Sequence, residues 1–201
     1  MLYEDWKENI SMWREKMRHL ELLSAYRFRI LQENIDPAGK NVLDIGSGPQ
    51  FMSDLLKQAG ANVTTMDKFA PCQFPCDVNE DFTGLLEGHS FDLIIAGGMI
   101  RYVNDHSLFF TRCKNLLSPG GILLVDEFNP NPYSEALLQG FAFSGIMEPW
   151  PKEDFPSLET IEHALTTLAG FTVDALYSCW PMVYLKGKYP FSAWYTIIVH
   201  C

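Results

Sequence analysis

The chain has 201 residues, 47% of them hydrophobic and 20% charged, so it has enough apolar surface to fold and intrinsic disorder is excluded as its main state. Its 25 acidic and 15 basic residues give a formal net charge of −10, and a field of that sign argues against a nucleic-acid partner. The longest apolar stretch, residues 93–100, is too short to span a membrane, and five cysteines, an odd number, are typical of reduced cytosolic thiols. We therefore expect one cytoplasmic domain over residues 1–201, with no membrane segment and no metal site.

The first segment, residues 2–34, is predicted to be helical, with an interruption at Ser24. Apolar residues recur in it at spacings of three and four, which is typical of one helix face: Tyr3, Trp6, Ile10, Trp13, Met17 and Leu20. This stripe has two interpretations, packing against the core or a lid over a bound ligand. We refer to residues 1–35 as the N-terminal cap.

After the cap, short apolar runs alternate with helical segments. Strands are predicted at 41–45, 62–66, 91–96, 121–126, 171–179 and 193–200, and helices at 50–59, 80–87, 104–117 and 157–169. Asn104 or Asp105 is expected to cap the helix that ends near Leu117. Such alternation predicts an α/β fold with a doubly wound, mostly parallel sheet. Residues 118–121 read as a turn, and the proline-rich segment 129–157 reads as an irregular insertion that lines the substrate pocket.

A glycine-rich turn directly follows the first strand. Gly46 and Gly48 let the backbone approach a ligand closely, and the helix after them offers unpaired N–H groups. Asp67, nineteen residues after Gly48, ends the second strand, where a carboxylate can accept both hydroxyls of a ribose. Nicotinamide dinucleotides and S-adenosylmethionine both fit this pattern. Asp44, inside the first strand, repels a pyrophosphate but attracts an ammonium or sulfonium group, which disfavours an NAD-dependent oxidoreductase.

At this point the chain resembles the class I S-adenosylmethionine-dependent methyltransferases. The resemblance rests on residues 42–49, 76–78, 91–95, 102–105 and 117–121 together with Asp67, and Gln50 departs from the glycine usual in the family. It implies S-adenosylmethionine as cofactor and a seven-stranded, Rossmann-like sheet whose last strand, 193–200, is antiparallel. The implied cofactor-binding residues are Asp44, Gly46, Ser47, Gly48, Asp67, Lys68, Asp77, Val78, Gly97, Gly98 and Met99.

The catalytic residues are expected at strand ends that face the crevice. Candidates for a base are Tyr102, His106, Asp126 and Glu127, of which Glu127 is favoured over His106; Arg101 is a candidate partner for a substrate carboxylate. The same two interpretations apply to aromatic residues that gather in the two irregular segments, and if they line a cavity the substrate is small and partly apolar or aromatic: Phe141, Phe143, Trp150, Phe155, Trp180 and Tyr184. We therefore expect methyl transfer to an oxygen or nitrogen atom of a small molecule. A non-catalytic S-adenosylmethionine-binding module is the alternative.

Overall fold

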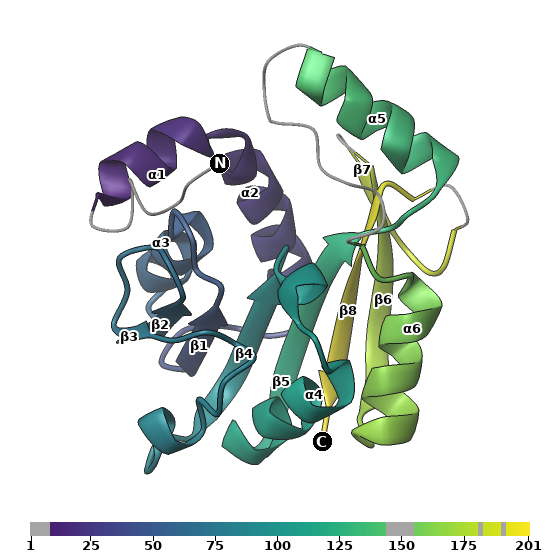
Figure 1. The fold of residues 1–201 in the computed structure, drawn as a ribbon. Coiled ribbons are helices and arrows are strands. Elements are labelled where there is room, and N and C mark those ends of the chain that lie inside the picture. Colours follow the sequence, from purple (N-terminus) through teal and green to yellow (C-terminus); the bar gives the residue numbers. More distant parts are fainter. Residues whose placement is uncertain (1–8, 144–154, 181–182, 190–191) are drawn as a thin grey trace.

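The computed structural model describes residues 9–143, 155–180, 183–189 and 192–201, and its centre is one sheet of eight strands (Figure 1). The strands, in spatial order, are β3 (Phe74–Pro75), β2 (Asn62–Asp67), β1 (Asn41–Ile45), β4 (Phe91–Gly97), β5 (Leu117–Phe128), β8 (Trp194–His200), β6 (Thr172–Trp180) and β7 (Val183–Lys186). From β3 to β5 all neighbours are parallel, whereas β8 runs antiparallel to both β5 and β6. The doubly wound, mostly parallel sheet is confirmed, with one strand more than the seven expected.

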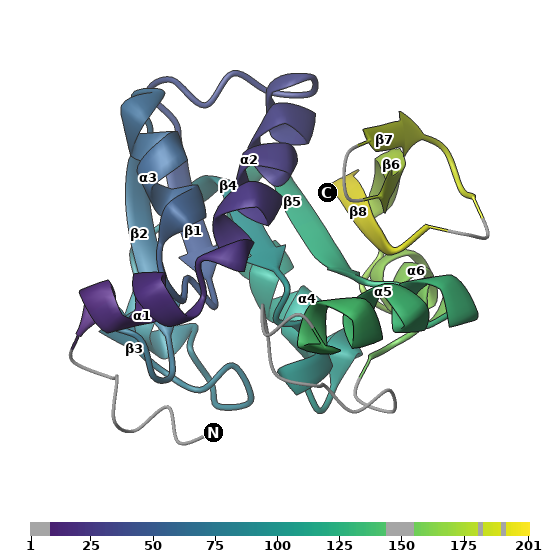
Figure 2. The same ribbon diagram turned by 90° about the horizontal axis from the view of Figure 1, so that it is seen from above.

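Helices cover both faces of this sheet (Figure 2). On one face lie α2 (His19–Gln32) and α3 (Phe51–Gln58), which bury Ile30, Leu31, Met52 and Leu56 against apolar strand residues. On the other face lie α4 (His106–Leu116) and α6 (Leu158–His163), which continues as a π-helix, η5 (Ala164–Leu168). Because both faces are covered, the central strands are rich in buried apolar residues, such as Val42, Leu43 and Ile45 of β1, as in parallel sheets generally.

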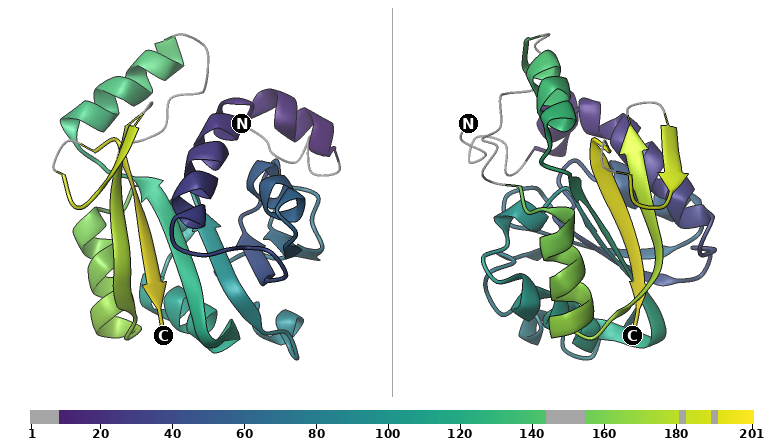
Figure 3. Two further views of the ribbon diagram at one scale, coloured as in Figure 1. Left: turned by 180° about the vertical axis from the view of Figure 1, so that it is seen from behind. Right: turned by 90° about the vertical axis from the view of Figure 1, so that its right-hand side faces the viewer.

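Two helices lie beyond the end of the sheet at which β4 and β5 end (Figure 3). They are α1 (Ile10–Lys16) and α5 (Pro132–Phe143), and short 3-10 turns, η2 (Gly84–Leu86) and η3 (Ile100–Tyr102), occupy two of the loops. Side-chain caps fix where the helices begin: Asn9 caps α1, Asp105 caps α4 as predicted, and Ser157 caps α6. Within the described ranges, no helix has the length and apolar character that crossing a membrane requires.

The cap differs from its prediction, because its helical segment is two helices that meet at Met17 and Arg18, not one helix broken at Ser24. Met17 leaves the helical region (φ −111°, ψ 27°), whereas Ser24 lies buried inside α2. A single serine costs a helix only a few tenths of a kcal/mol, about 0.5, so it is a weak interruption signal. Tyr3 and Trp6 lie outside the described residues.

Three other expectations were wrong. Segment 129–157 is not irregular throughout, because α5 begins at Pro132, a residue favoured in the first turn of a helix, and Asn131 Oδ1 accepts hydrogen bonds from the next backbone N–H groups. Residues 118–121 continue β5 instead of forming a turn, and only Gly84–Leu86 of the helix predicted at 80–87 is helical.

Candidate functional site

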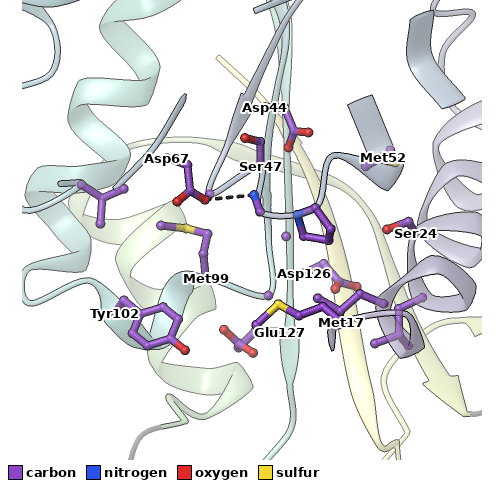
Figure 4. Close-up of a pocket in the computed structure, with 18 of the residues that line it drawn as sticks. Met17, Ser24, Asp44, Ser47, Met52, Asp67, Met99, Tyr102, Asp126 and Glu127 are labelled. Atoms are coloured by element: carbon purple, nitrogen blue, oxygen red, sulfur yellow. Dashed lines mark hydrogen bonds between the residues drawn. The ribbon is translucent and has the colours of Figure 1, made fainter. Parts of the chain in front are cut away.

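A cavity of about 440 Å³ lies where β1, β2, β4 and β5 end, next to α1 and α2 (Figure 4). The residues that the resemblance assigns to the cofactor all line it: Asp44, Gly46, Ser47, Gly48, Asp67, Lys68, Asp77, Val78, Gly97, Gly98 and Met99. Tyr102, Asp126 and Glu127 line it too. The topology therefore brings residues from four strand ends to one pocket.

His106 is the exception among the predicted site residues. It is the first residue of α4 and does not belong to the described lining of the cavity. A ring nitrogen lies 3.3 Å from the Ile100 carbonyl oxygen, and the ring stacks on Phe110 with centroids 6.5 Å apart. The contacts of His106 are thus local ones that join η3 to α4.

The glycine-rich turn has a backbone that suits glycine. Gly46 and Gly48 have φ of 68° and 46°, and a Cβ on Gly46 would lie 2.9 Å from the Met99 side chain. Gln50 has φ of 62° and is the one non-glycine residue with positive φ in the described part of the chain. Its side-chain amide donates to the Pro71 carbonyl. Gln50 therefore has the left-handed backbone that usually requires glycine, and its side chain adds a hydrogen bond to the loop after β2.

Asp67 is already strongly engaged. Its Oδ2 accepts the Gly48 N–H at 2.9 Å, and its Oδ1 accepts the N–H groups of Phe69 at 2.7 Å and Ala70 at 2.8 Å. A carboxylate offers about four lone-pair sites, so these three bonds leave room for about one more donor. That Asp67 binds a ribose stays a prediction, and the three bonds limit how many further donors its carboxylate can accept.

Two polar groups nearby favour a ligand that supplies hydrogen bonds and positive charge. The Ser47 hydroxyl is buried and has no hydrogen-bond partner within the described residues. Asp44 is buried too, and it accepts a hydrogen bond from the Ser53 hydroxyl. Burial raises the pKa of Asp44 from 3.8 to about 6, although the Ser53 hydrogen bond and the charge of Arg27 oppose the rise.

Arg27 of α2 is a charged lining residue that sequence reasoning missed. Its guanidinium forms an ion pair with Asp126, whose second carboxylate oxygen accepts the Thr196 hydroxyl at 2.8 Å. Its Nε is buried and lacks a hydrogen-bond partner in the part of the chain that the structure describes. The guanidinium lies across Gly97, where a Cβ would come within 2.6 Å of its Cζ. The small residue at 97 was therefore a sequence signal for a large side chain packed on it.

Side-chain contacts connect the loops that follow β2, β3 and β4. Lys68 Nζ lies 2.7 Å from a carboxylate oxygen of Asp77, and partial burial is outweighed by hydrogen bonds from Lys68 and Asn79, which lower the pKa of Asp77. The Asn79 side chain also donates to the Tyr102 carbonyl oxygen at 2.9 Å and accepts the Asn104 N–H at 2.8 Å. Asn79 thus links the loop that carries Asp77 to the loop that carries Tyr102.

A second group of lining residues, which we call the Glu127 end, comprises Arg101, Tyr102, Glu127, Phe128 and Trp194. Figure 4 shows Tyr102 and Glu127 on the far side of Met99 from Asp67 and Ser47. Glu127 is 1% exposed, and its carboxylate accepts the N–H groups of Phe128 at 2.9 Å and Arg101 at 3.3 Å. Burial raises the pKa of Glu127, and the charge of Arg101 opposes the rise.

The cap contributes to the cavity through α1 and α2. Trp13, Met17, Leu20 and Ser24 line it, and Trp13 also packs on Ala70 in a small cluster separate from the two main cores. Arg14 fastens α1 to the glycine-rich turn, because its Nε donates to the Pro49 carbonyl at 3.1 Å and its Nη2 lies 2.5 Å from Asp54.

The predicted pocket aromatics separate into two groups. Phe155 packs edge-on against Phe128, which lines the cavity, at a centroid distance of 5.5 Å. Tyr184 instead packs on α2, where its hydroxyl donates to Glu33 at 2.6 Å. The side chains of Phe141, Phe143, Trp150 and Trp180 lie outside the described residues.

The chain is similar to proteins of one kind. Residues 4–176 match a family model described as "Methyltransferase domain". A ubiquinone biosynthesis O-methyltransferase from Xanthomonas axonopodis pv. citri is 29% identical over 134 residues, covering 59% of this chain and 55% of the relative. One from Coxiella burnetii is 28% identical over 131 residues, covering 58% and 55%. The chain thus spans about half the length of these curated relatives.

Solved structures share the fold. An S-adenosylmethionine-dependent methyltransferase from Archaeoglobus fulgidus superimposes with a TM-score of 0.65 at 19% identity, covering 94% of this chain and 98% of that one. A possible histamine N-methyltransferase from Thermotoga maritima gives 0.64 at 16% identity, covering 94% and 93%. At these identities the likeness establishes the arrangement of strands and helices.

Proposed function

The chain belongs to the methyltransferase domain family, a group of enzymes whose cofactor is S-adenosylmethionine, and we propose that it transfers the cofactor's methyl group to an oxygen or nitrogen atom of a small molecule. One observation carries the proposal: a single cavity of about 440 Å³ combines the glycine-rich turn with a buried carboxylate, Glu127. That volume lies in the range of about 300–1,000 Å³ that small-molecule pockets occupy. The O-methyltransferase relatives favour a hydroxyl as acceptor.

The cofactor fits the polar groups of the turn. The Ser47 hydroxyl, without a partner among the described residues, would gain one from the bound cofactor. Gly46 has no side chain, so it leaves open the space in which a Cβ would collide with the Met99 side chain. Asp67 would accept one ribose hydroxyl with its remaining capacity, and Asp77 and Val78 line the cavity where the resemblance expects the adenine.

Asp44 and Arg27 fit the two charged groups at the amino-acid end of the cofactor. They lie near enough to each other for the Arg27 charge to lower the pKa of Asp44. Asp44 would hold the ammonium group, and the buried Arg27 Nε, which has no hydrogen-bond partner among the described residues, would donate to the carboxylate. Binding of the ammonium group would favour the ionised form of the Asp44 carboxyl, because a nearby positive charge lowers the pKa of an acid.

Glu127 is the proposed base. The cofactor, when bound, supplies a methyl group on a positively charged sulfur that a nucleophile attacks in line. Glu127 would take the proton that a hydroxyl or amine loses when it forms its new bond to the methyl carbon. Its raised pKa suits that role, since a base works best when its pKa is close to the working pH. Phe128 and Trp194 would shield the acceptor from water.

The test combines binding with turnover. Calorimetry should show binding of S-adenosylhomocysteine and none of NAD, and a panel of phenols and amines should yield S-adenosylhomocysteine from S-adenosylmethionine. Glu127→Gln should keep the affinity for S-adenosylhomocysteine and lose about 10²-fold or more in turnover. His106→Ala, outside the described lining, is the matched control and should keep both.

The outcomes separate the alternatives. Binding without turnover over the whole panel would favour a non-catalytic binding module. Full turnover by Glu127→Gln would contradict Glu127 as base, and failure to bind S-adenosylhomocysteine would contradict the cofactor site.

A further inference from the structure

The three cationic side chains of the described cavity lining differ in what surrounds them. Arg27 is paired with Asp126, and Lys68 lies 2.7 Å from Asp77. Arg101, at the Glu127 end, lies over two aromatic rings, since its Cζ is 4.8 Å from the ring centroid of Tyr102 and 4.8 Å from that of Phe155. The Glu127 end therefore carries a positive charge that aromatic side chains position.

From this arrangement we propose that the methyl acceptor carries a carboxylate and that Arg101 is the residue that selects it. The inference rests on the proposed function, because it concerns the substrate of the same cavity.

The geometry of a guanidinium supports this role. A planar guanidinium directs its N–H groups outward in its plane, which is the geometry that binds a carboxylate in a bidentate manner. Nη2 of Arg101 also donates a hydrogen bond of 3.0 Å to the Tyr102 hydroxyl, which lies in the same cavity lining. Stacking also fixes the side chain in advance, which lowers the entropy cost of binding.

The neighbours of Arg101 suit the rest of such an acceptor. Phe128 and Trp194 line the same end and pack edge-on with centroids 6.1 Å apart, which provides an apolar wall for a ring. Glu127 accepts the Arg101 backbone N–H, so the proposed base and the anion-binding residue are adjacent. An acceptor bound by its carboxylate at Arg101 would thus place a second polar group within reach of Glu127.

The test uses benzoate and benzamide, which share one shape and differ in charge. Their dissociation constants are measured with saturating S-adenosylhomocysteine and again without it, by tryptophan fluorescence, because Trp13 and Trp194 line the cavity. The wild-type protein should bind benzoate at least about tenfold more tightly than benzamide. Arg101→Gln should lose this preference, and Arg101→Lys should retain part of it. Arg112→Gln is the matched control, since Arg112 also lies over an aromatic ring, that of Phe82 at 5.7 Å, but is not among the described lining residues.

Two results would overturn the inference: equal affinities of the wild-type protein for benzoate and benzamide, or a preference for benzoate that persists in Arg101→Gln. The wild-type comparison needs no variant to fold. Binding of S-adenosylhomocysteine is measured in the same samples, so a failure of the cofactor site is distinguishable from a failure of the carboxylate site.

Discussion

Replacing Asp44 with asparagine should stabilise the ligand-free protein near neutral pH. Burial raises the pKa of this carboxyl from 3.8 to about 6, so the folded protein binds a proton that the unfolded chain has released. Stability from this group is therefore fully present below pH 4 and is lost as the pH rises through 6. The difference of roughly 2 between the two pKa values corresponds to about 3 kcal/mol. Asp44→Asn should thus equal the wild-type protein at low pH and exceed it by up to about 3 kcal/mol at pH 7.5.

Urea unfolding of both proteins between pH 4.5 and 7.5 measures this difference, and subtracting the two curves removes the titration of the other groups. Ser53→Ala is a useful companion, because the Ser53 hydrogen bond lowers the pKa of Asp44 and its loss should steepen the fall in stability. The same carboxylate should help to bind the cofactor's ammonium group, so the stabler Asp44→Asn should bind S-adenosylhomocysteine more weakly. A stability difference that does not change with pH would refute the reasoning.

Two further predictions concern backbone and packing. Gly97→Ala should lower the free energy of unfolding in urea by about 3 kcal/mol, because its Cβ would lie 2.6 Å from the Arg27 Cζ and displace a buried ion pair. Gly84→Ala should change it little, because no atom of the described residues lies within 4 Å of the new Cβ. Equal losses of stability in the two variants would contradict the packing argument. Gln50→Gly and Gln50→Ala both lose the hydrogen bond to Pro71, but only glycine adopts the left-handed backbone without strain. The glycine variant should therefore be more stable than the alanine variant by about 1 kcal/mol in thermal or urea unfolding. The reverse order of stability would contradict the backbone argument.

The part of the site that could be predicted from sequence is the part encoded locally. Asp44, Gly46 and Gly48 lie within five residues, and Asp67 ends the next parallel strand, so the βαβ rule alone brings them to one edge of the sheet. Arg27 is different, because its partner Asp126 is 99 positions away and an arginine on a helix is usually solvated. His106 is a converse case, since it begins a capped helix nine positions after β4 ends and is not among the described lining residues.

The fold shows the same division. Apolar runs predict β1, β2, β4 and β5, each of which contains at least three consecutive buried residues, whereas the prolines at the start of α5 indicate a loop, so the sequence does not predict this helix. The eighth strand, β7, has only Tyr184 partly buried among four residues, so its pattern resembles a surface loop. Its Tyr184 makes contacts distant in sequence, with Tyr26 of α2 and with Glu33, which directly follows α2.

Asp67 accepts hydrogen bonds from three backbone N–H groups, and no other residue type at position 67 can accept all three. Asparagine has the same shape but one acceptor oxygen, so it can serve either Gly48 or the pair at 69 and 70, and glutamate is one methylene too long for a buried side chain. If the asparagine oxygen accepts the N–H groups of residues 69 and 70, the glycine-rich turn loses its hydrogen bond at Gly48. If it accepts the Gly48 N–H instead, the loop at Ala70 loses its hydrogen bonds, and Trp13 of α1 packs on that residue. Weak cofactor binding by an Asp67 variant would therefore report a change in the shape of the pocket as much as a missing contact to the ribose.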